Sequence, residues 1–166
     1  MTTQVQNGTA KMEVNIGIGE GQRKAIAEAL STVLADTYML YLRTHNYHWN
    51  VTGELFHSLH EQFEEQYTEL AEAVDEIAER IRAIGFKAPG TFKEFQRLTS
   101  LEETTEELKA LEMVRRLAEG NEQVIRTARV ALEAPKEADD EATIDLLTQR
   151  LDLHSKVAWM LRSHLD

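Results

Sequence analysis

One stretch of the chain decides the interpretation of the rest: HWNVTGELFHSLHEQFEEQYTELAEAVDEIAER, residues 48–80. It carries two pairs of side chains of the kinds that bind metals, His60 with Glu64 and Asp75 with Glu79. The members of each pair are one helical turn apart, so on a helix they share a face. The stretch therefore predicts a long helix with two separate clusters of metal-ligand type.

The two clusters lie too far apart along one helix to hold the same ion. About 15 residues at ~1.5 Å rise separate their centres by roughly 22 Å. A site built from both clusters needs two chains, and His48 at the end of the preceding helix can join His60 and Glu64. The spacing predicts a symmetric oligomer with a dinuclear metal centre at its interface.

Hydrophobic periodicity predicts four long helices, over 22–49, 56–84, 105–133 and from about Asp140 to the C-terminus. A short helix over 91–95 is expected in the connector, capped by Thr91 with Glu94 three positions later. Residues 1–20, polar and rich in glycine, are expected to form a flexible N-terminal arm before a folded domain over 21–166. This pattern predicts an all-α, ferritin-like four-helix bundle with a short extra helix in the crossover between helices 2 and 3.

Composition narrows the function. With 166 residues, 42% of them apolar and two prolines, the chain suits one compact helical domain. No apolar run approaches the ~18 residues of a membrane span, and the N-terminal sequence has no signal pattern, so a cytoplasmic location is expected. Cysteine is absent, which excludes thiolate chemistry and leaves nitrogen and oxygen ligands for any metal.

The net charge of −11 argues against a general nucleic-acid binder, because non-specific affinity depends on Lys and Arg at phosphates. An acidic surface suits cations, although the same charge can serve only to keep the protein soluble.

The flank of the second helix fits a two-fold contact. His60, Glu64, Asp75 and Glu79 share this flank, and small side chains between them would let another helix approach. Two antiparallel copies related by a dyad near residues 69–70 would set each His/Glu pair against the partner's Asp/Glu pair. Two imidazoles and three carboxylates suit iron, manganese or zinc, with ferric iron favoured by the carboxylates.

Two alternatives compete with this site. The acids can be ordinary charges on a solvated face, with Asp75 and Glu79 paired to Arg82 or Lys87. A di-metal centre inside one bundle would need Glu-x-x-His motifs on two helices. The chain has one such match, residues 54–57, and it straddles a loop, so this second alternative is not favoured.

Three motifs resemble those of the Dps family, the mini-ferritins called DNA-binding proteins from starved cells. They are HWNVTG at 48–53, FxxLHxxFExxY at 56–67 and DxxAER at 75–80. The resemblance extends across the bundle to the segment around Trp159. It implies a dodecameric shell with di-iron ferroxidase centres at two-fold interfaces.

By motif position, the resemblance implies that His48, His60 and Glu64 come from one subunit and Asp75 and Glu79 from its neighbour. Trp49 resembles a family tryptophan that intercepts radicals or relays electrons, although it can equally be an aromatic filling the interface. The implied reaction is oxidation of Fe(II) by hydrogen peroxide, or more slowly by dioxygen, with ferric mineral stored in the cavity to protect the cell from oxidative damage.

Further candidates lie nearby. Acids at the start of the fourth helix include Asp140 and Asp145. The resemblance implies that these two line pores through which iron enters, while helix capping explains them equally well. His45 and His57 are each one turn before a candidate ligand. Local hydrogen bonding is favoured over metal coordination for both.

Two other functions compete with that of a ferroxidase. A nucleoid protein that compacts and protects DNA is a weak alternative, because the arm holds one lysine, Lys11, and the C-terminus has no basic run. A metal-free helical scaffold would show no saturable Fe(II) binding.

Overall fold

The computed structural model describes residues 13–166, and most of the predicted N-terminal arm, residues 1–12, lies outside them. The helices are α1 (Glu20–Asn50), α2 (Phe56–Ala83), α3 (Phe92–Leu98), α4 (Ala110–Ala131), α5 (Glu133–Glu137) and α6 (Glu141–Arg162). Over the described residues the chain is all-helical, without strands, as predicted. None of these helices is both long and apolar enough to cross a membrane.

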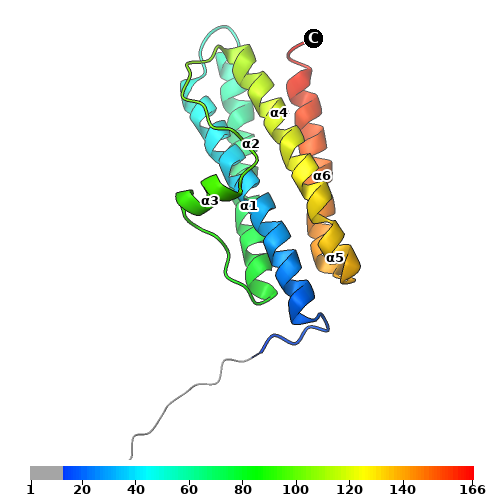
Figure 1. The fold of residues 1–166 in the computed structure, drawn as a ribbon. Coiled ribbons are helices and arrows are strands. Elements are labelled where there is room, and N and C mark those ends of the chain that lie inside the picture. The colour runs from blue at the N-terminus through cyan, green and yellow to red at the C-terminus, as the bar shows by residue number, and fades with distance from the viewer. Residues whose placement is uncertain (1–12) are drawn as a thin grey trace, which may run out of the picture.

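Four long helices, α1, α2, α4 and α6, form the bundle (Figure 1). The α1–α2 and α4–α6 pairs are antiparallel hairpins, and the crossover from α2 to α4 runs along the outside of the bundle with α3 in it (Figure 1). The C-terminus lies at the same end as the α1–α2 connection (Figure 1). The predicted ferritin-like topology is confirmed.

The core follows the predicted apolar stripes. Ile26, Leu30 and Leu40 of α1 are fully buried, and so are Phe63 and Ile77 of α2. Each such side chain contributes about 1.5–3 kcal/mol when it leaves water, so these stripes are what hold the hairpins together.

Gly120 inside α4 has a packing reason. A Cβ at this position would lie 2.7 Å from Cδ1 of Leu40, so glycine lets α4 pack closely on α1. The sequence alone shows only that glycine weakens a helix here; the close approach of α1 explains its presence.

Asp36 anchors the crossover in a way that the sequence did not predict. Its carboxylate is fully buried and accepts hydrogen bonds from the Thr99 hydroxyl (2.8 Å), the Ser100 amide (2.6 Å) and the Thr127 hydroxyl (2.6 Å). A buried carboxylate needs such donors. Asp36 thereby ties the end of α3 to α1 and α4.

Two connections show how local chemistry sets the helix ends. The predicted capping box at α3 is confirmed, because Thr91 Oγ1 accepts from the Glu94 amide (3.3 Å) and Glu94 accepts from the Thr91 amide (3.1 Å). The third long helix begins at Ala110 rather than near 105. Thr104 accepts from the Glu106 amide there (3.2 Å), a local turn that competes with a helix.

The additional short helix α5 was also not predicted. Pro135 lies within its first turn, where a missing N–H breaks no helical hydrogen bond. Proline therefore separates α4 from α6 without preventing one further turn between them.

Candidate metal centre

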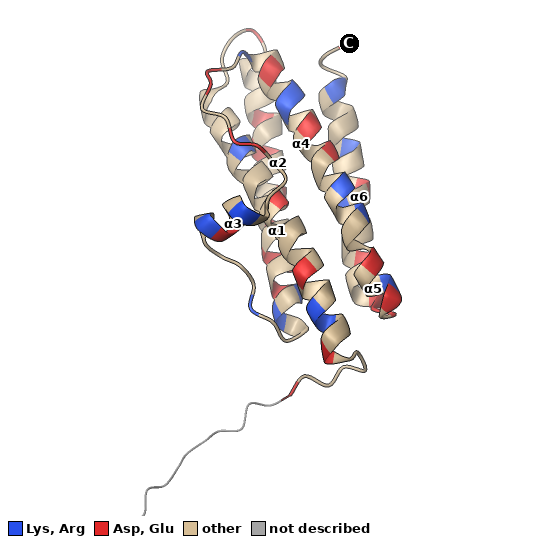
Figure 2. Ribbon diagram, in the orientation of Figure 1, with Lys and Arg blue, Asp and Glu red and all other residues tan. Residues whose placement is uncertain are grey.

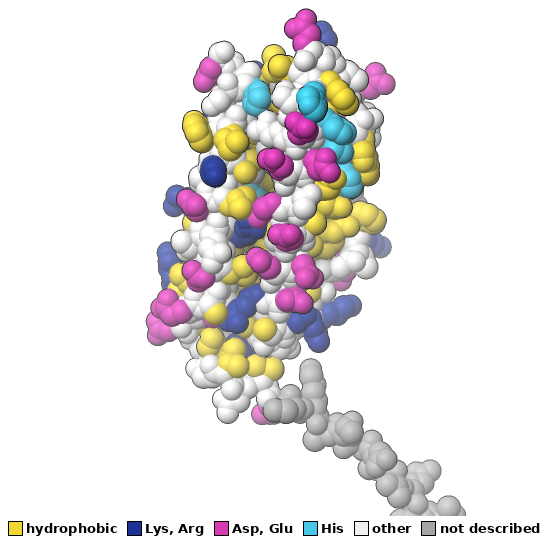
Figure 3. Space-filling view, turned by 180° about the vertical axis from the view of Figure 1, so that it is seen from behind, with side chains coloured by type: hydrophobic (Ala, Val, Ile, Leu, Met, Phe, Trp, Pro, Cys, Tyr) yellow, Lys and Arg dark blue, Asp and Glu magenta, His cyan; other side chains and the backbone are white. Residues whose placement is uncertain are grey.

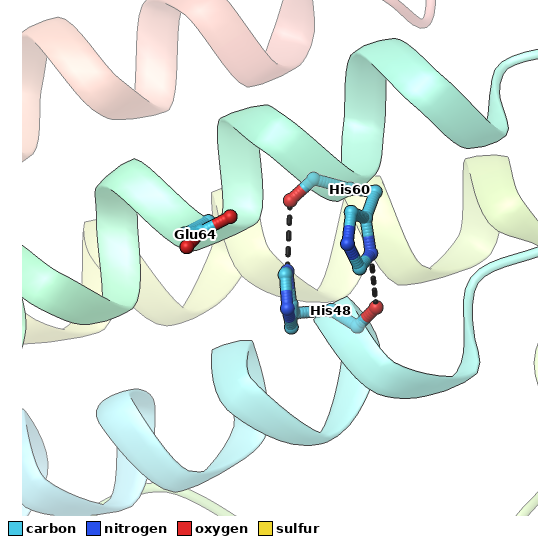
Figure 4. Close-up of side chains that lie close together, drawn as sticks. All are labelled: His48, His60 and Glu64. Atoms are coloured by element: carbon cyan, nitrogen blue, oxygen red, sulfur yellow. Dashed lines mark hydrogen bonds between the residues drawn. The ribbon is translucent and has the colours of Figure 1, made fainter.

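His48, His60 and Glu64 gather where α1 meets α2 (Figure 4). One potential ligand atom from each lies within 4.8 Å of the other two. The short α1–α2 connection makes this possible: Gly53, at φ 101°, takes a left-handed conformation, and its carbonyl accepts from the Phe56 amide (3.0 Å). Within the described part of the chain, this is the one grouping of three or more such donors.

The two histidines hold each other in place. His48 Nδ1 lies 2.8 Å from the His60 carbonyl oxygen, and His60 Nδ1 lies 2.9 Å from the His48 carbonyl oxygen (Figure 4). A carbonyl oxygen only accepts, so each Nδ1 carries the proton and donates it. In the neutral form of each ring the lone pair is therefore on Nε2, the arrangement in which imidazole binds a metal.

Packing adds to this fixed geometry. The His48 and His60 rings stack with centroids 3.8 Å apart and an interplanar angle of 19°. His48 is buried, His60 is half-buried and Glu64 is exposed. The cluster is therefore buried on the side of His48 and open to solvent on the side of Glu64.

Asp75 and Glu79 lie elsewhere on the same helix. Both are exposed, and neither belongs to the His48–His60–Glu64 cluster. Because α2 is one continuous helix from Phe56 to Ala83, the separation expected from the sequence exists in the fold. A shared site for all five candidates inside one chain is excluded by this geometry, and the two-chain site stays a prediction.

The solvated-face alternative predicts ion pairs for these acids. Among the described residues, neither Asp75 nor Glu79 forms one, and the Arg82 guanidinium donates instead to the Phe86 carbonyl (2.9 Å).

Seen from behind, the molecule has histidines gathered toward one end and acids spread along the length of the face (Figure 3).

Aromatic rings surround the candidate centre. His45 stacks on Tyr67 at 4.0 Å between ring centroids and also lies 4.0 Å from Trp49. Burial and the nearby His48 lower the pKa of His45. His45 packs among rings and has no ligand atom in the cluster, while His57 is exposed beside Glu61.

Trp49 is 62% exposed, next to His48 in the sequence. Its side chain meets His45 on one side, and the remainder faces out from the chain. Both the relay role and the interface role of Trp49 stay predictions.

Asp140, one of the two predicted pore acids, caps α6. It is 3% exposed, and its carboxylate accepts from Arg80 (2.6 Å) and from the Thr143 hydroxyl (2.6 Å) and caps α6 through the Thr143 amide (3.2 Å). Burial alone would raise the pKa of Asp140, but the Arg80 and Thr143 hydrogen bonds outweigh it and lower the pKa. The capping role that competes with the pore role is therefore present, and a role of Asp140 in iron entry stays a prediction.

Asp145, the second predicted pore acid, is exposed and accepts from the Gln149 side chain (2.7 Å). Its role in iron entry stays a prediction. Sequence reasoning could not separate the two acids, because Arg80 reaches Asp140 from 60 residues away.

The sequence of this chain is similar to those of known proteins. A family model named Ferritin, a ferritin-like domain, matches residues 27–166. DNA protection during starvation protein 2 of Bacillus anthracis is 41% identical over 143 residues, covering 86% of this chain and 98% of that protein. An uncharacterized low temperature-induced protein of Nostoc sp. is 39% identical over 155 residues, covering 92% of this chain and 87% of that protein.

A solved structure agrees as well. The crystal structure of the DPS protein from Vibrio cholerae O1 superposes with a TM-score of 0.88 at 31% identity and covers 95% of this chain and all of that one. That protein is described as a member of a broad superfamily of ferritin-like diiron-carboxylate proteins. Fold and matches together define a ferritin-like protein. Within that class, the chain belongs to the Dps family.

Proposed function

We propose that this protein is a ferroxidase that oxidises Fe(II) with hydrogen peroxide, or more slowly with dioxygen, and stores the ferric product as mineral inside a dodecameric shell. The observation that carries the proposal is the reciprocal hydrogen bonding of His48 and His60. It directs each Nδ1 at a carbonyl oxygen, so that in the neutral ring the lone pair is on Nε2. One potential ligand atom from each of His48, His60 and Glu64 lies within 4.8 Å of the other two.

The residues present fit iron as a substrate. Neutral imidazoles and carboxylates form the mixed nitrogen and oxygen set that iron accepts. Their geometry is fixed before iron arrives, since both rings are held by main-chain carbonyls. This preorganisation favours metal binding because little side-chain freedom remains to be lost.

The site is completed by a second chain. Asp75 and Glu79 of the partner subunit would supply two further carboxylates to the exposed side of the cluster, where Glu64 lies. In this chain both acids are exposed and free of ion pairs among the described residues, so they are available for such a contact. An isologous two-fold contact would form two such sites at once.

The reaction uses the pair of irons as a two-electron donor. Two Fe(II) ions give one electron each to hydrogen peroxide, the O–O bond breaks, and two protons are taken up to give two water molecules and two Fe(III). Delivering both electrons together avoids releasing a hydroxyl radical. Within this scheme His48 and His60 bind iron as neutral rings, while Glu64 and the partner carboxylates balance the increased charge of the ferric product.

Relatives support the proposal without deciding the substrate. The Vibrio cholerae protein is placed among diiron-carboxylate proteins, and the Bacillus anthracis relative is named for DNA protection during starvation. Direct compaction of DNA is the weaker candidate for this chain. Its net charge is −11, and Figure 2 shows acidic and basic residues interspersed along the helices.

Anaerobic titration with Fe(II) tests the proposal. We expect saturable binding at two irons per subunit, followed on peroxide addition by consumption of one peroxide for every two irons. The exposed Glu64→Gln variant keeps the fold and should lose saturable binding at the site. Unsaturable binding by the wild type, or peroxide consumption equal to that of free Fe(II), would refute a ferroxidase.

A further inference from the structure

A second polar site lies between α2 and α6, away from the candidate metal centre. A groove of about 400 Å³ runs there, and its apolar wall includes Leu70, Leu153, Val157 and Met160. His154 and Asn121 also line it. The remaining lining residues are polar or charged: Gln62, Glu65, Gln66, Glu69, Asp152 and Lys156. An open groove that combines an apolar wall with polar groups has the general character of a small-molecule site.

His154 in this groove has a defined tautomer. The Asn121 side-chain amide donates to the Leu117 carbonyl (2.8 Å), so its Oδ1 faces His154 Nδ1, also at 2.8 Å. Because Oδ1 only accepts, Nδ1 carries the proton and Nε2 bears a lone pair. Burial, together with the charge of Arg150, lowers the pKa of His154 to about 3, so the ring is neutral at physiological pH.

Nε2 of this ring is a buried acceptor without a donor. His154 is fully buried, and Nε2 has no hydrogen-bond partner among residues 13–166. A buried polar atom without a partner costs about 1–3 kcal/mol. A ligand that brings a donor to Nε2 removes this cost.

The neighbouring charges select a neutral ligand. Arg150, one turn before His154, binds Glu69 of α2 through one guanidinium nitrogen, and its Nε likewise has no partner within the described residues. The positive guanidinium disfavours a cation beside His154, and the Nε2 lone pair with the Glu69 carboxylate disfavours an anion. A hydroxyl group donates to Nε2 without adding charge.

We propose that the α2–α6 groove is a binding site for a small neutral hydroxy compound of the phenol class, with its hydroxyl donating to His154 Nε2 and its ring against Leu70 and Val157. Because His154 is fully buried, binding requires side chains of the groove lining to move and let the hydroxyl reach Nε2. Met160 and Gln66 line the groove, and their long side chains are flexible. The proposal does not depend on iron chemistry.

The test compares phenol with anisole, its methyl ether, which has the same ring and no donor. Calorimetric titration of the assembled wild-type protein should show saturable binding of phenol at least about tenfold tighter than that of anisole, as expected when one buried hydrogen bond is lost. The preference should be unchanged from pH 5 to pH 8, because His154 stays neutral there.

Two variants locate the effect. His154→Leu combined with Asn121→Leu removes the acceptor and its hydrogen-bonded partner together, and should bind phenol and anisole equally. Asp152→Asn, on the exposed rim of the same groove, should keep the wild-type preference because the ligand is neutral. If the double variant does not assemble, the wild-type comparison still decides. Absence of phenol binding, or equal affinity for the two compounds in the wild type, overturns the proposal.

Discussion

The two halves of α2 differ in whether their candidate metal ligands are held in place by the rest of the chain. The first half carries His60 and Glu64, packs against His48 of α1 and holds its imidazoles by main-chain hydrogen bonds. The second half carries Asp75 and Glu79, which are exposed and engaged by no ion pair among the described residues. One half is a preorganised site and the other a set of donors facing outward, a difference that a two-chain centre explains.

The largest expected effect comes from the outward half. Glu79→Ala should lower saturable Fe(II) binding and peroxide consumption at least about 100-fold, because loss of a ligand exceeds the 10–100-fold typical of a residue that only supports a ligand. Stability of the fold should be unchanged within about 0.5 kcal/mol, since the side chain is exposed.

Glu76→Ala is the matched control, an exposed acid on the same turn that points away from the flank shared by the four candidates. It should leave iron binding intact. Equal losses in both variants would mean that general acidity, rather than a particular carboxylate, draws iron to α2.

The preorganised half should respond differently. His60→Leu removes the hydrogen bond from its ring to the His48 carbonyl, so it should cost about 1–2 kcal/mol of folding stability as well as iron binding. Thermal unfolding of the apo-protein measures the first effect. Glu64→Gln should lose iron binding without this destabilisation, and a stable His60→Leu protein would argue against mutual support of the two histidines.

A smaller effect, on folding stability, is expected from the contact between Arg80, in the second half of α2, and Asp140. Arg80, next to Glu79, holds Asp140, so Asp140→Asn should cost about 1 kcal/mol at pH 7 and leave the rate of iron oxidation within about twofold. Because the folded-state pKa of Asp140 is lowered, its carboxylate stabilises the fold above its ordinary pKa of 3.8. That contribution is lost as pH falls through the lowered value.

Unfolding of Asp140→Asn and the wild type at pH 7 and near pH 3 checks this sign, since the difference between them should shrink in acid. Asp145→Asn, at an exposed site, is the control for stability. A large fall in iron uptake in Asp140→Asn with normal stability would instead support Asp140 as a pore acid.

The bundle could be predicted from the sequence because its apolar residues recur with the period of a helix. The stripes of α1 and α2 and the capping box at Thr91 are local patterns, and all are present. Features that depend on distant partners were missed: Asp36 reaches Thr127 across 91 residues, and Arg80 reaches Asp140 across 60. Which acid is free and which is engaged cannot be read from spacing alone.

In the candidate centre, too, local spacing was informative and contacts with distant partners were not predictable. Spacing identified His48, His60 and Glu64 as neighbours, and the structure brings these three together. The reciprocal Nδ1 hydrogen bonds were not predictable, because they depend on how the loop after Asn50 returns the chain. The buried Asn121–His154 pair is not predictable from the sequence, because a lone histidine on an apolar face gives no signal by itself.

Mixed assemblies test the central claim, that each site joins a His48–His60–Glu64 half to the Asp75–Glu79 half of another chain. Each of the variants His60→Leu and Glu79→Ala keeps one intact half, and neither alone should consume peroxide with iron. Coexpressed in equal amounts and assembled at random, they should recover about one quarter of the wild-type sites, because an intact half then meets an intact half at that frequency. No recovery in assemblies shown to contain both variants would contradict the two-chain centre.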